Sequence, residues 1–84
     1  MKLSIGTLIK YKRWDGRTVA IGVITRFNER DGRFTGMPSY TIHWTDRPDW
    51  WQSNISHVLA RVVENSQPVD GGEHQYCILT RGIS

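Results

Sequence analysis

Apolar and polar residues alternate most regularly in the middle of the chain. Across residues 40–46, Tyr40, Ile42 and Trp44 occupy every second position, and threonine or histidine stands between them. In an extended strand, side chains two positions apart point to the same face of the sheet. We therefore predict a half-buried strand here, with the three large apolar side chains facing a core.

The residues that follow this strand predict a tight turn and a return strand. The sequence Asp-Arg-Pro-Asp at 46–49 contains residues that favour turns, and Trp50 and Trp51 come directly after it. Adjacent residues in a strand point to opposite faces, so only one of these two indoles can be inside. We assign Trp51, together with Trp44, to the core and leave Trp50 exposed.

Two further strands are predicted near the N-terminus. Residues 7–13 form the first, with Ile9 and Tyr11 as its core-facing pair, and residues 18–27 form the second. Residues 14–17 join them, and the Asp-Gly pair in this segment favours a tight hairpin turn because both residues tolerate positive φ angles. The two strands are therefore expected to pair as a hairpin.

The second of these strands is expected to bend. Its alternate residues Val19, Ile21, Val23 and Phe27 predict an inward-facing apolar stripe. Gly22 is then on the opposite face, where the missing side chain suits a bulge or a sharp bend. Such a bend lets a short antiparallel sheet close into a barrel.

The remainder of the chain alternates between loops and short structured segments. Residues 28–38 predict a loop with two glycines and a proline, residues 53–59 predict a single helical turn, and residues 60–63 predict a short closing strand. A polar linker at 64–73 leads to strand-like residues 74–80, which either complete the sheet or pair with another copy of the chain. We favour the first, because an uncovered apolar edge promotes aggregation.

The predicted arrangement resembles the SH3-like barrel fold. It has five short strands, a first connection with a tryptophan, a bent second strand and a helical turn before the last strand. Within this superfold, residues 5–63 are similar to the Tudor and KOW-type arrangement. The predicted fold class is thus all-β, a small barrel of five to six strands with one short helical turn before the fifth strand. We place the barrel in residues 1–65, and residues 66–84 are expected to form a linker followed by a sixth strand or a tail.

A closer resemblance is to small proteins encoded by tailed bacteriophages. Their pattern has a Gly-Thr-Leu-Ile-like start, a Gly-Val-Ile strand, a strand that ends in Trp-Thr-Asp, a further tryptophan and a final Leu-x-x-Val-Val. In this chain the matching pieces are residues 6–9, 22–24 and 44–46, then Trp51 and residues 59–63. The resemblance implies a viral setting rather than a particular activity.

Composition limits what such a chain can be. Its 84 residues suffice for one domain with a thin core. The chain has four tryptophans, and any of them that does not pack in this core is a candidate for a binding surface. The formal net charge of +3 permits contact with nucleic acid or an acidic partner. The single cysteine, Cys77, indicates a reducing compartment, and no segment has the character of a signal peptide or a membrane span. We expect a protein of the host cytoplasm or of a virion, without a membrane partner.

The residues that could support catalysis or metal binding are poorly arranged for either. His43, His57 and His74 have no cysteine or carboxylate at ligand spacing beside them. Cys77 and His74 are three residues apart on a predicted strand and would point to opposite faces. We therefore expect no enzymatic activity, no metal and no cofactor.

Binding is the function that remains, and the exposed tryptophan and arginine side chains of the loops are candidates for it. Both residue types are enriched at the hot spots of protein interfaces. The residues predicted to contact a protein partner are Trp14, Arg17, Phe34, Arg47 and Trp50.

Two alternatives use overlapping residues. Binding of nucleic acid would combine base stacking on loop tryptophans with arginine contacts, and its candidate residues are Arg13, Trp14, Arg17, Arg26, Arg30, Arg33 and Arg47. The Tudor resemblance implies instead an aromatic cage for a methylated lysine or arginine, at the matching positions Trp14, Phe27, Tyr40, Trp44 and Asp46. Acidic residues in the same loops count against nucleic acid, so we favour a protein partner.

Overall fold

The computed structural model describes residues 2–81, which contain six strands, one α-helix and two 3-10 turns. The strands are β1 (Leu8–Arg13), β2 (Thr18–Asp31), β3 (Met37–Asp46), β4 (Ile55–Leu59), β5 (Pro68–Val69) and β6 (His74–Thr80). The helix α1 spans Ala60–Glu64, and the 3-10 turns η1 and η2 span Gly32–Phe34 and Asp70–Gly72.

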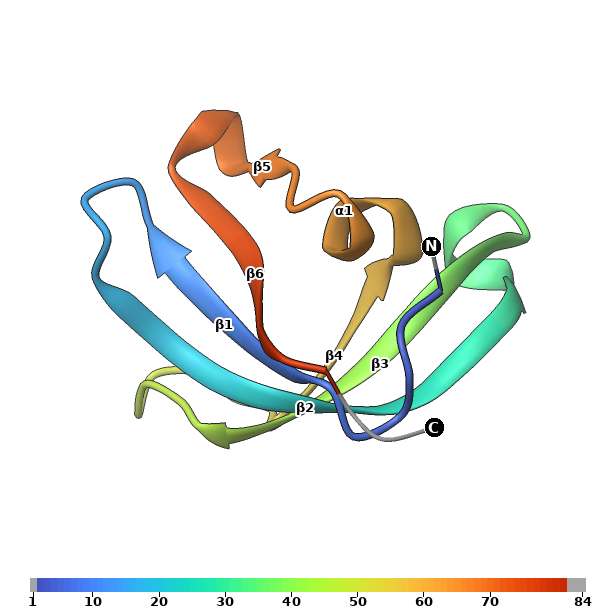
Figure 1. The fold of residues 1–84 in the computed structure, drawn as a ribbon, viewed down its shortest axis with the longest axis horizontal. Helices are drawn as coiled ribbons and strands as arrows, with labels where there is room; N and C mark the ends of the chain where they lie inside the picture. Colours follow the sequence, from blue (N-terminus) through green and yellow to red (C-terminus); the bar gives the residue numbers. More distant parts are fainter. Residues whose placement is uncertain (1, 82–84) are drawn as a thin grey trace.

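All six strands belong to one antiparallel sheet in the order β4-β3-β2-β1-β6-β5. The long strands β2 and β3 curve, so that the sheet curls into a half-barrel with α1 on its concave side (Figure 1). This confirms the predicted all-β class with five to six strands and one short helix. The described residues include no helix that is long and apolar enough to cross a membrane.

β3 confirms the strand predicted at the centre of the chain. Tyr40, Ile42 and Trp44 are all buried and form the middle of the core. The polar atoms of the two aromatic residues have partners as well. The Trp44 indole N–H donates to Ser56 Oγ over 2.7 Å, and the Tyr40 hydroxyl accepts from the Leu3 backbone N–H over 2.7 Å. Burial of these rings therefore leaves no polar atom of theirs without a hydrogen bond.

The inward face of β2 is opposite to the one predicted. Ala20 and Ile24 are buried against the core, with Gly22 between them. The expected inward stripe is only half-buried and consists of Val19, Ile21 and Val23. Both faces of this segment are apolar, so alternation alone could not choose between them. Phe27 does pack against the core, because the register shifts between Ile24 and Arg26 and reverses the alternation.

Gly22 allows β2 to pass very close to β3. A Cβ atom on this residue would lie 2.7 Å from both Ile42 Cγ2 and Trp44 Cε3, and 2.9 Å from the carbonyl oxygen of His43. These distances are too short for any side chain, so the inward position next to Trp44 requires glycine. The register also shifts between Ile21 and Gly22, which confirms the irregularity predicted at this glycine.

Several predicted connections differ from the structure. β2 continues to Asp31, so the loop expected at 28–38 is a hairpin closed by η1. The return strand expected at Trp50 and Trp51 is absent from the described structure, since both residues lie in the loop between β3 and β4. The predicted helical turn is β4, and the predicted closing strand at 60–63 is α1. All five residues of β4 pair with β3, and this pairing outweighs a local helical pattern.

The C-terminal segment completes the sheet, as expected. All six residues of β1 pair with β6, among them Lys10 with Cys77 and Tyr11 with Tyr76. The predicted linker is partly structured too, since β5 pairs with the start of β6 and η2 turns the chain between them. Residues 74–80 therefore belong to the same sheet as the strands that precede them.

Candidate functional site

Two exposed tryptophans line an open groove at one end of the half-barrel. Trp14 is 75% exposed in the β1–β2 turn, and Trp50 is 78% exposed in the loop between β3 and β4. The groove between these loops has a volume of about 1060 Å³, and its other aromatic and aliphatic lining residues are Tyr11, Val19, Pro48 and Trp51. We call this feature the tryptophan groove.

Backbone hydrogen bonds fix the β1–β2 turn that carries Trp14. The Arg13 N–H donates to the Arg17 carbonyl over 2.8 Å, and the Gly16 N–H donates to the Arg13 carbonyl over 2.9 Å. Gly16 has a φ of 87°, a left-handed conformation that glycine adopts without strain. The Trp14 N–H donates to the Glu73 carbonyl over 2.8 Å, which ties the turn to the segment before β6. The Trp14 indole is therefore exposed on a fixed backbone.

Trp51 and Arg47 hold the loop between β3 and β4. The Trp51 ring packs edge-on against Trp44, with ring centroids 5.3 Å apart, and the Trp51 N–H donates to the Pro48 carbonyl over 3.2 Å. The Arg47 guanidinium donates to the Trp51 carbonyl. Because Trp51 is anchored against the core, its neighbour Trp50 projects outward. Trp44 and Trp51 thus belong to the core and Trp50 to the surface, as predicted.

Tyr11, Asp70 and His74 form a further wall of the groove. The Tyr11 hydroxyl donates to Asp70 Oδ2 over 3.1 Å, and the His74 ring stacks on the Tyr11 ring with centroids 4.9 Å apart. His74 Nδ1 lies 3.2 Å from the same oxygen without the alignment of a hydrogen bond, so the contact becomes an ion pair when His74 is protonated. Burial and the bond to Asp70 raise the pKa of Tyr11, which keeps its hydroxyl a proton donor at neutral pH.

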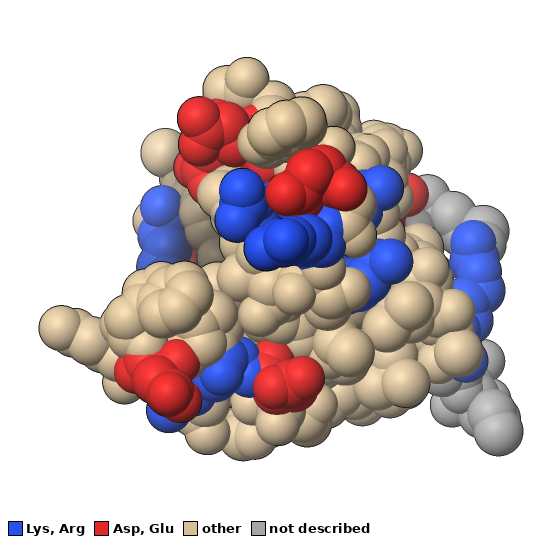
Figure 2. Space-filling view, turned by 90° about the vertical axis from the view of Figure 1, so that its left-hand side faces the viewer, with Lys and Arg blue, Asp and Glu red and all other residues tan. Residues whose placement is uncertain are grey.

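Charges of both signs line the tryptophan groove. Three arginines and four carboxylates contribute, namely Arg13, Arg17, Arg47, Asp46, Asp49, Asp70 and Glu73. Figure 2 views the molecule from the side of the β1–β2 turn and the loop after β3, and it shows blue and red atoms next to one another without a large area of one sign. The positive charge of the chain is therefore not concentrated at this groove.

A smaller hollow lies next to the groove. It has a volume of about 420 Å³ and is lined by seven uncharged residues, namely Tyr11, Trp51, Gln52, Ser53, Ile55, Ser56 and Tyr76. Tyr11 and Trp51 line both the groove and this hollow, and their ring centroids are 5.7 Å apart. Ile55 is 46% exposed. We call this feature the apolar hollow after its aromatic and aliphatic side, which consists of Tyr11, Trp51, Ile55 and Tyr76; its other side is polar and consists of Gln52, Ser53 and Ser56.

The structure brings four of the five predicted partner-binding residues together. Trp14, Arg17, Arg47 and Trp50 all line the tryptophan groove. Phe34 does not, because it is half-buried in η1 at the tip of the β2–β3 hairpin, on the opposite side of the molecule (Figure 1). Arg47 also uses part of its guanidinium to hold its own loop.

The residues of the nucleic-acid alternative do not gather on one face. Three of the seven are remote from the groove, toward the β2–β3 hairpin, namely Arg26, Arg30 and Arg33. Arg33 is paired with Asp31 at 3.1 Å, and Arg13 lies 3.5 Å from Asp15. These positions divide the arginines between the two ends of the molecule.

The residues of the aromatic-cage alternative do not surround a common opening. Tyr40 and Trp44 are buried, so neither offers a ring face to a ligand. Phe27 packs on Tyr40 with ring centroids 5.3 Å apart. Trp14 and Asp46 line the tryptophan groove instead. The structure therefore places these five side chains in two separate environments.

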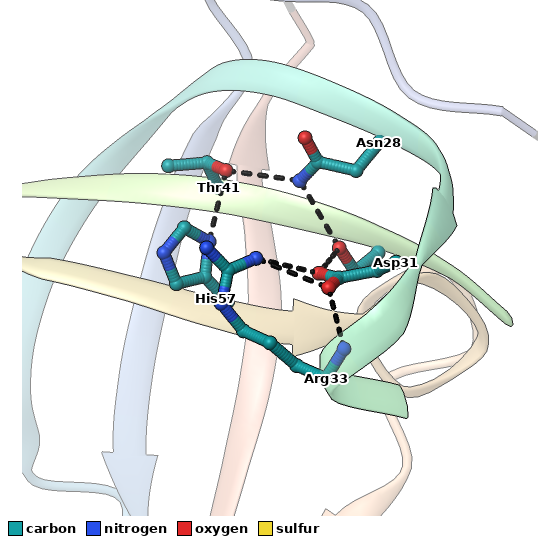
Figure 3. A network of polar contacts seen from close by, with 6 residues as sticks. Asn28, Asp31, Arg33, Thr41 and His57 are labelled. Carbon is teal, nitrogen blue, oxygen red and sulfur yellow. Dashed lines mark hydrogen bonds and ion pairs between the residues drawn. The ribbon is translucent and has the colours of Figure 1, made fainter. Parts of the chain in front are cut away.

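A polar cluster lies at the β2–β3 hairpin (Figure 3). Asp31 is only 4% exposed, accepts a hydrogen bond from the Ser39 hydroxyl over 2.6 Å, and has both carboxylate oxygens 3.1 Å from Arg33 Nη1. The Ser39 bond, followed by the contacts with Arg33, lowers the pKa of Asp31 below its ordinary value. The carboxylate is therefore held charged inside the hairpin.

The same cluster continues across β3 to β4. Asn28 Nδ2 donates to Ser39 Oγ over 3.1 Å and to Thr41 Oγ1 over 3.0 Å, and Thr41 Oγ1 lies 3.1 Å from His57 Nδ1. Because these side chains satisfy one another, we interpret the cluster as support for the hairpin rather than as a reactive site. Within residues 2–81, no group of three or more His, Cys, Asp or Glu side chains is placed to hold a metal ion.

Sequence reasoning missed the part of the groove that comes from the C-terminal segment. Asp70, Glu73 and His74 line the groove, although this region is predicted only as a linker and a strand start. They reach it because β6 pairs with β1, where His74 is opposite Arg13. The Asp-Gly-Gly sequence before β6 marks a turn, but nothing in it indicates that the turn lies beside Trp14.

Comparisons with protein-family models, curated proteins and solved structures give no match to this chain. We therefore infer function from the residues of the tryptophan groove and of the apolar hollow.

Proposed function

We propose that this protein is a non-enzymatic interaction module whose tryptophan groove binds a protein partner. The observation that carries the proposal is the exposure of two indoles, 75% for Trp14 and 78% for Trp50, on loops that line one groove. Large aromatic side chains are normally a major part of the core in a small domain. Two that remain outside on a common surface are typical of a binding site.

The loops that carry these indoles are already held in place. The Trp14 N–H is bonded to Glu73, and Trp51 anchors the second loop against the core. A partner would order few backbone degrees of freedom on binding, which lowers the entropic cost of association. The groove also combines aromatic walls with charges of both signs, a composition that suits a protein surface.

Binding of nucleic acid is the second candidate, because the chain carries a net charge of +3 and three arginines line the groove. Bases would stack on Trp14 or Trp50 while arginines contact phosphates. The four carboxylates of the groove would repel phosphates, which favours the protein partner. The two candidates differ in their response to salt. Affinity for an oligonucleotide would fall by orders of magnitude between about 50 and 200 mM salt, whereas a partner held by Trp50 would respond weakly.

A pull-down tests the proposal. The resemblance to phage-encoded proteins makes an assembly role in a virion or an infected cell part of the proposal, so host and virion lysates are the sources to use. The baits are wild type, Trp14→Ala, Trp50→Ala and the control Leu79→Ala, which removes a 43% exposed apolar side chain outside the groove.

We expect a partner that wild type and Leu79→Ala retain and that both tryptophan variants lose, with the fold of every bait verified by circular dichroism. A set of bound proteins that neither tryptophan substitution changes would contradict the proposal.

A further inference from the structure

The arginines of the tryptophan groove are already engaged within the chain. Arg13 lies 3.5 Å from Asp15 Oδ2, and Arg17 lies 4.0 Å from the same oxygen. Arg47 donates to the Trp51 carbonyl. The Asp15 carboxylate therefore offsets part of the charge of Arg13 and Arg17, and the hydrogen bond to the carbonyl fixes the position of Arg47.

The carboxylates of the groove are less engaged. Asp70 accepts a hydrogen bond from Tyr11 over 3.1 Å. The side chains of Asp46, Asp49 and Glu73 also line the groove, but they form no hydrogen bond or ion pair with other residues of the described chain. The lining of the groove has four carboxylates against three arginines and therefore carries a slight excess of negative charge, although the chain as a whole is positive.

Two of these three carboxylates belong to residues next to the exposed indoles. Asp49 directly precedes Trp50 in the chain, and the Glu73 carbonyl accepts the Trp14 N–H over 2.8 Å. An indole face attracts a cation through its quadrupole, and a carboxylate attracts it through charge and hydrogen bonds. Each exposed indole therefore has an acidic residue as its neighbour, in sequence for Trp50 and through a backbone hydrogen bond for Trp14, and an indole and a carboxylate that line one groove can together recognise an ammonium or a guanidinium.

The apolar hollow adds a second requirement for a ligand. It contains no charged residue, and it shares the side chains of Tyr11 and Trp51 with the tryptophan groove. Ile55 lines it and is 46% exposed. A ligand in the groove can therefore reach this hollow with an aliphatic or aromatic side chain.

From these contacts we infer that the partner contributes a peptide segment with a lysine or arginine in the tryptophan groove and an apolar side chain in the apolar hollow. The inference rests on the proposed function and specifies the chemistry of the partner. An extended segment turns alternate side chains to the same side, so a single segment can supply both groups. The same carboxylates disfavour an anionic ligand.

Selection from a random-peptide library tests this inference. The baits are wild type, Trp50→Ala, Glu73→Lys, Ile55→Ser and Glu29→Lys. Glu29 is exposed on β2 and does not line the groove, so Glu29→Lys makes the same chemical change as Glu73→Lys at a remote position. Substitutions at exposed positions change stability little, so that altered selection reports on binding.

We expect wild type and Glu29→Lys to select the same peptides, each with a lysine or arginine and an apolar residue. Glu73→Lys should bind these peptides at least about tenfold more weakly, as expected for the loss of one cation contact. Ile55→Ser should lose the preference for the apolar residue, and Trp50→Ala should enrich none of these peptides.

Two results would overturn the inference and leave the proposed function intact. The first is a set of Trp50-dependent peptides without an excess of basic residues, and the second is a set of Trp50-dependent peptides that bind Glu73→Lys as well as wild type. An unchanged apolar preference in Ile55→Ser would overturn the assignment of the apolar hollow. If no selected peptide depends on Trp50, or if a labelled oligonucleotide binds in a manner that depends on Trp50, the proposed function fails as well.

Discussion

The Tyr40 hydroxyl connects three parts of the fold. It accepts a hydrogen bond from the Leu3 backbone N–H over 2.7 Å and donates one to Glu64 Oε2 over 2.6 Å. The ring itself is fully buried on β3, Leu3 is buried near the N-terminus, and Glu64 is the last residue of α1. Tyr40→Phe would keep the ring and delete only these two hydrogen bonds.

The loss of both bonds should be large for a domain of this size. A hydrogen bond to a charged carboxylate contributes about 1.5–3 kcal/mol, and a buried N–H left without an acceptor costs about 1–3 kcal/mol. With partial relaxation around Leu3, we expect Tyr40→Phe to lower the free energy of unfolding by about 2–4 kcal/mol. This corresponds to a fall in melting temperature of roughly 10–25 °C.

Urea unfolding followed by circular dichroism measures this change. Tyr76→Phe is the matched control, because the Tyr76 ring also packs against the core while its hydroxyl forms no hydrogen bond within residues 2–81. We expect the control to stay within about 0.5 kcal/mol of wild type. A loss in Tyr40→Phe that is no larger than the loss in Tyr76→Phe would refute this role of the hydroxyl.

Three further predictions concern packing and titration. Gly22→Ala should destabilise the fold by about 1–3 kcal/mol through overpacking against β3. The control Gly32→Ala, whose Cβ would meet nothing within 4 Å, should be nearly neutral in the same urea assay. Equal effects of the two substitutions would contradict the close approach of β2 to β3. Asp31→Asn should destabilise the protein at neutral pH, because the lowered native pKa of Asp31 stabilises the folded state while the carboxylate is charged. The difference in stability between this variant and wild type should disappear as the pH falls from the ordinary carboxyl pKa of 3.8 through the lower native pKa. A difference that persists in acid would argue against a charged Asp31. Burial, and to a smaller extent neighbouring carboxylates, raise the pKa values of Tyr40 and Tyr76 from 10.0 to about 12. The two tyrosines therefore contribute to stability below pH 10, and this contribution is lost as the pH rises toward 12. An absorbance titration of the folded protein that shows both phenols ionising near pH 10 would contradict their burial.

β3 could be predicted from the sequence because one periodicity accounts for all of its large side chains. Tyr40, Ile42 and Trp44 can be buried together only on one face of a strand, and polar residues fill the other face. β2 offers no such choice, since the segment around Gly22 is apolar on both faces. Its inward face is selected by the close contact of Gly22 with β3, and sequence periodicity does not reveal that contact.

The short elements after the groove loop could not be assigned from local pattern. Residues 55–59 have apolar side chains at helical spacing, yet they pair with β3 as β4. Ala60 and Val63 are both buried one helical turn apart in α1, although the same short sequence also suits a strand. Over five residues the two periodicities are hard to distinguish, so pairing with β3 decides the outcome.

The exposed position of Trp50 was predicted correctly, but the strand alternation used to predict it does not exist. Trp50 and Trp51 lie in a loop rather than in a strand. Trp51 is fixed by ring contacts with Trp44 and Tyr11, and its neighbour is consequently left outside.

The charge around the exposed indoles depends on which segments of the chain meet at the groove. Trp14 comes from the β1–β2 turn, Trp50 from the loop after β3, and Glu73 from the segment that precedes β6. The sequence shows both indoles and the net charge of +3, but Glu73 is brought to the groove and to the backbone of Trp14 by the pairing of β6 with β1. A chain that is basic as a whole thus presents unused acids at its groove. We therefore expect the proposed partner to complement the local charge of the groove rather than the net charge of the protein.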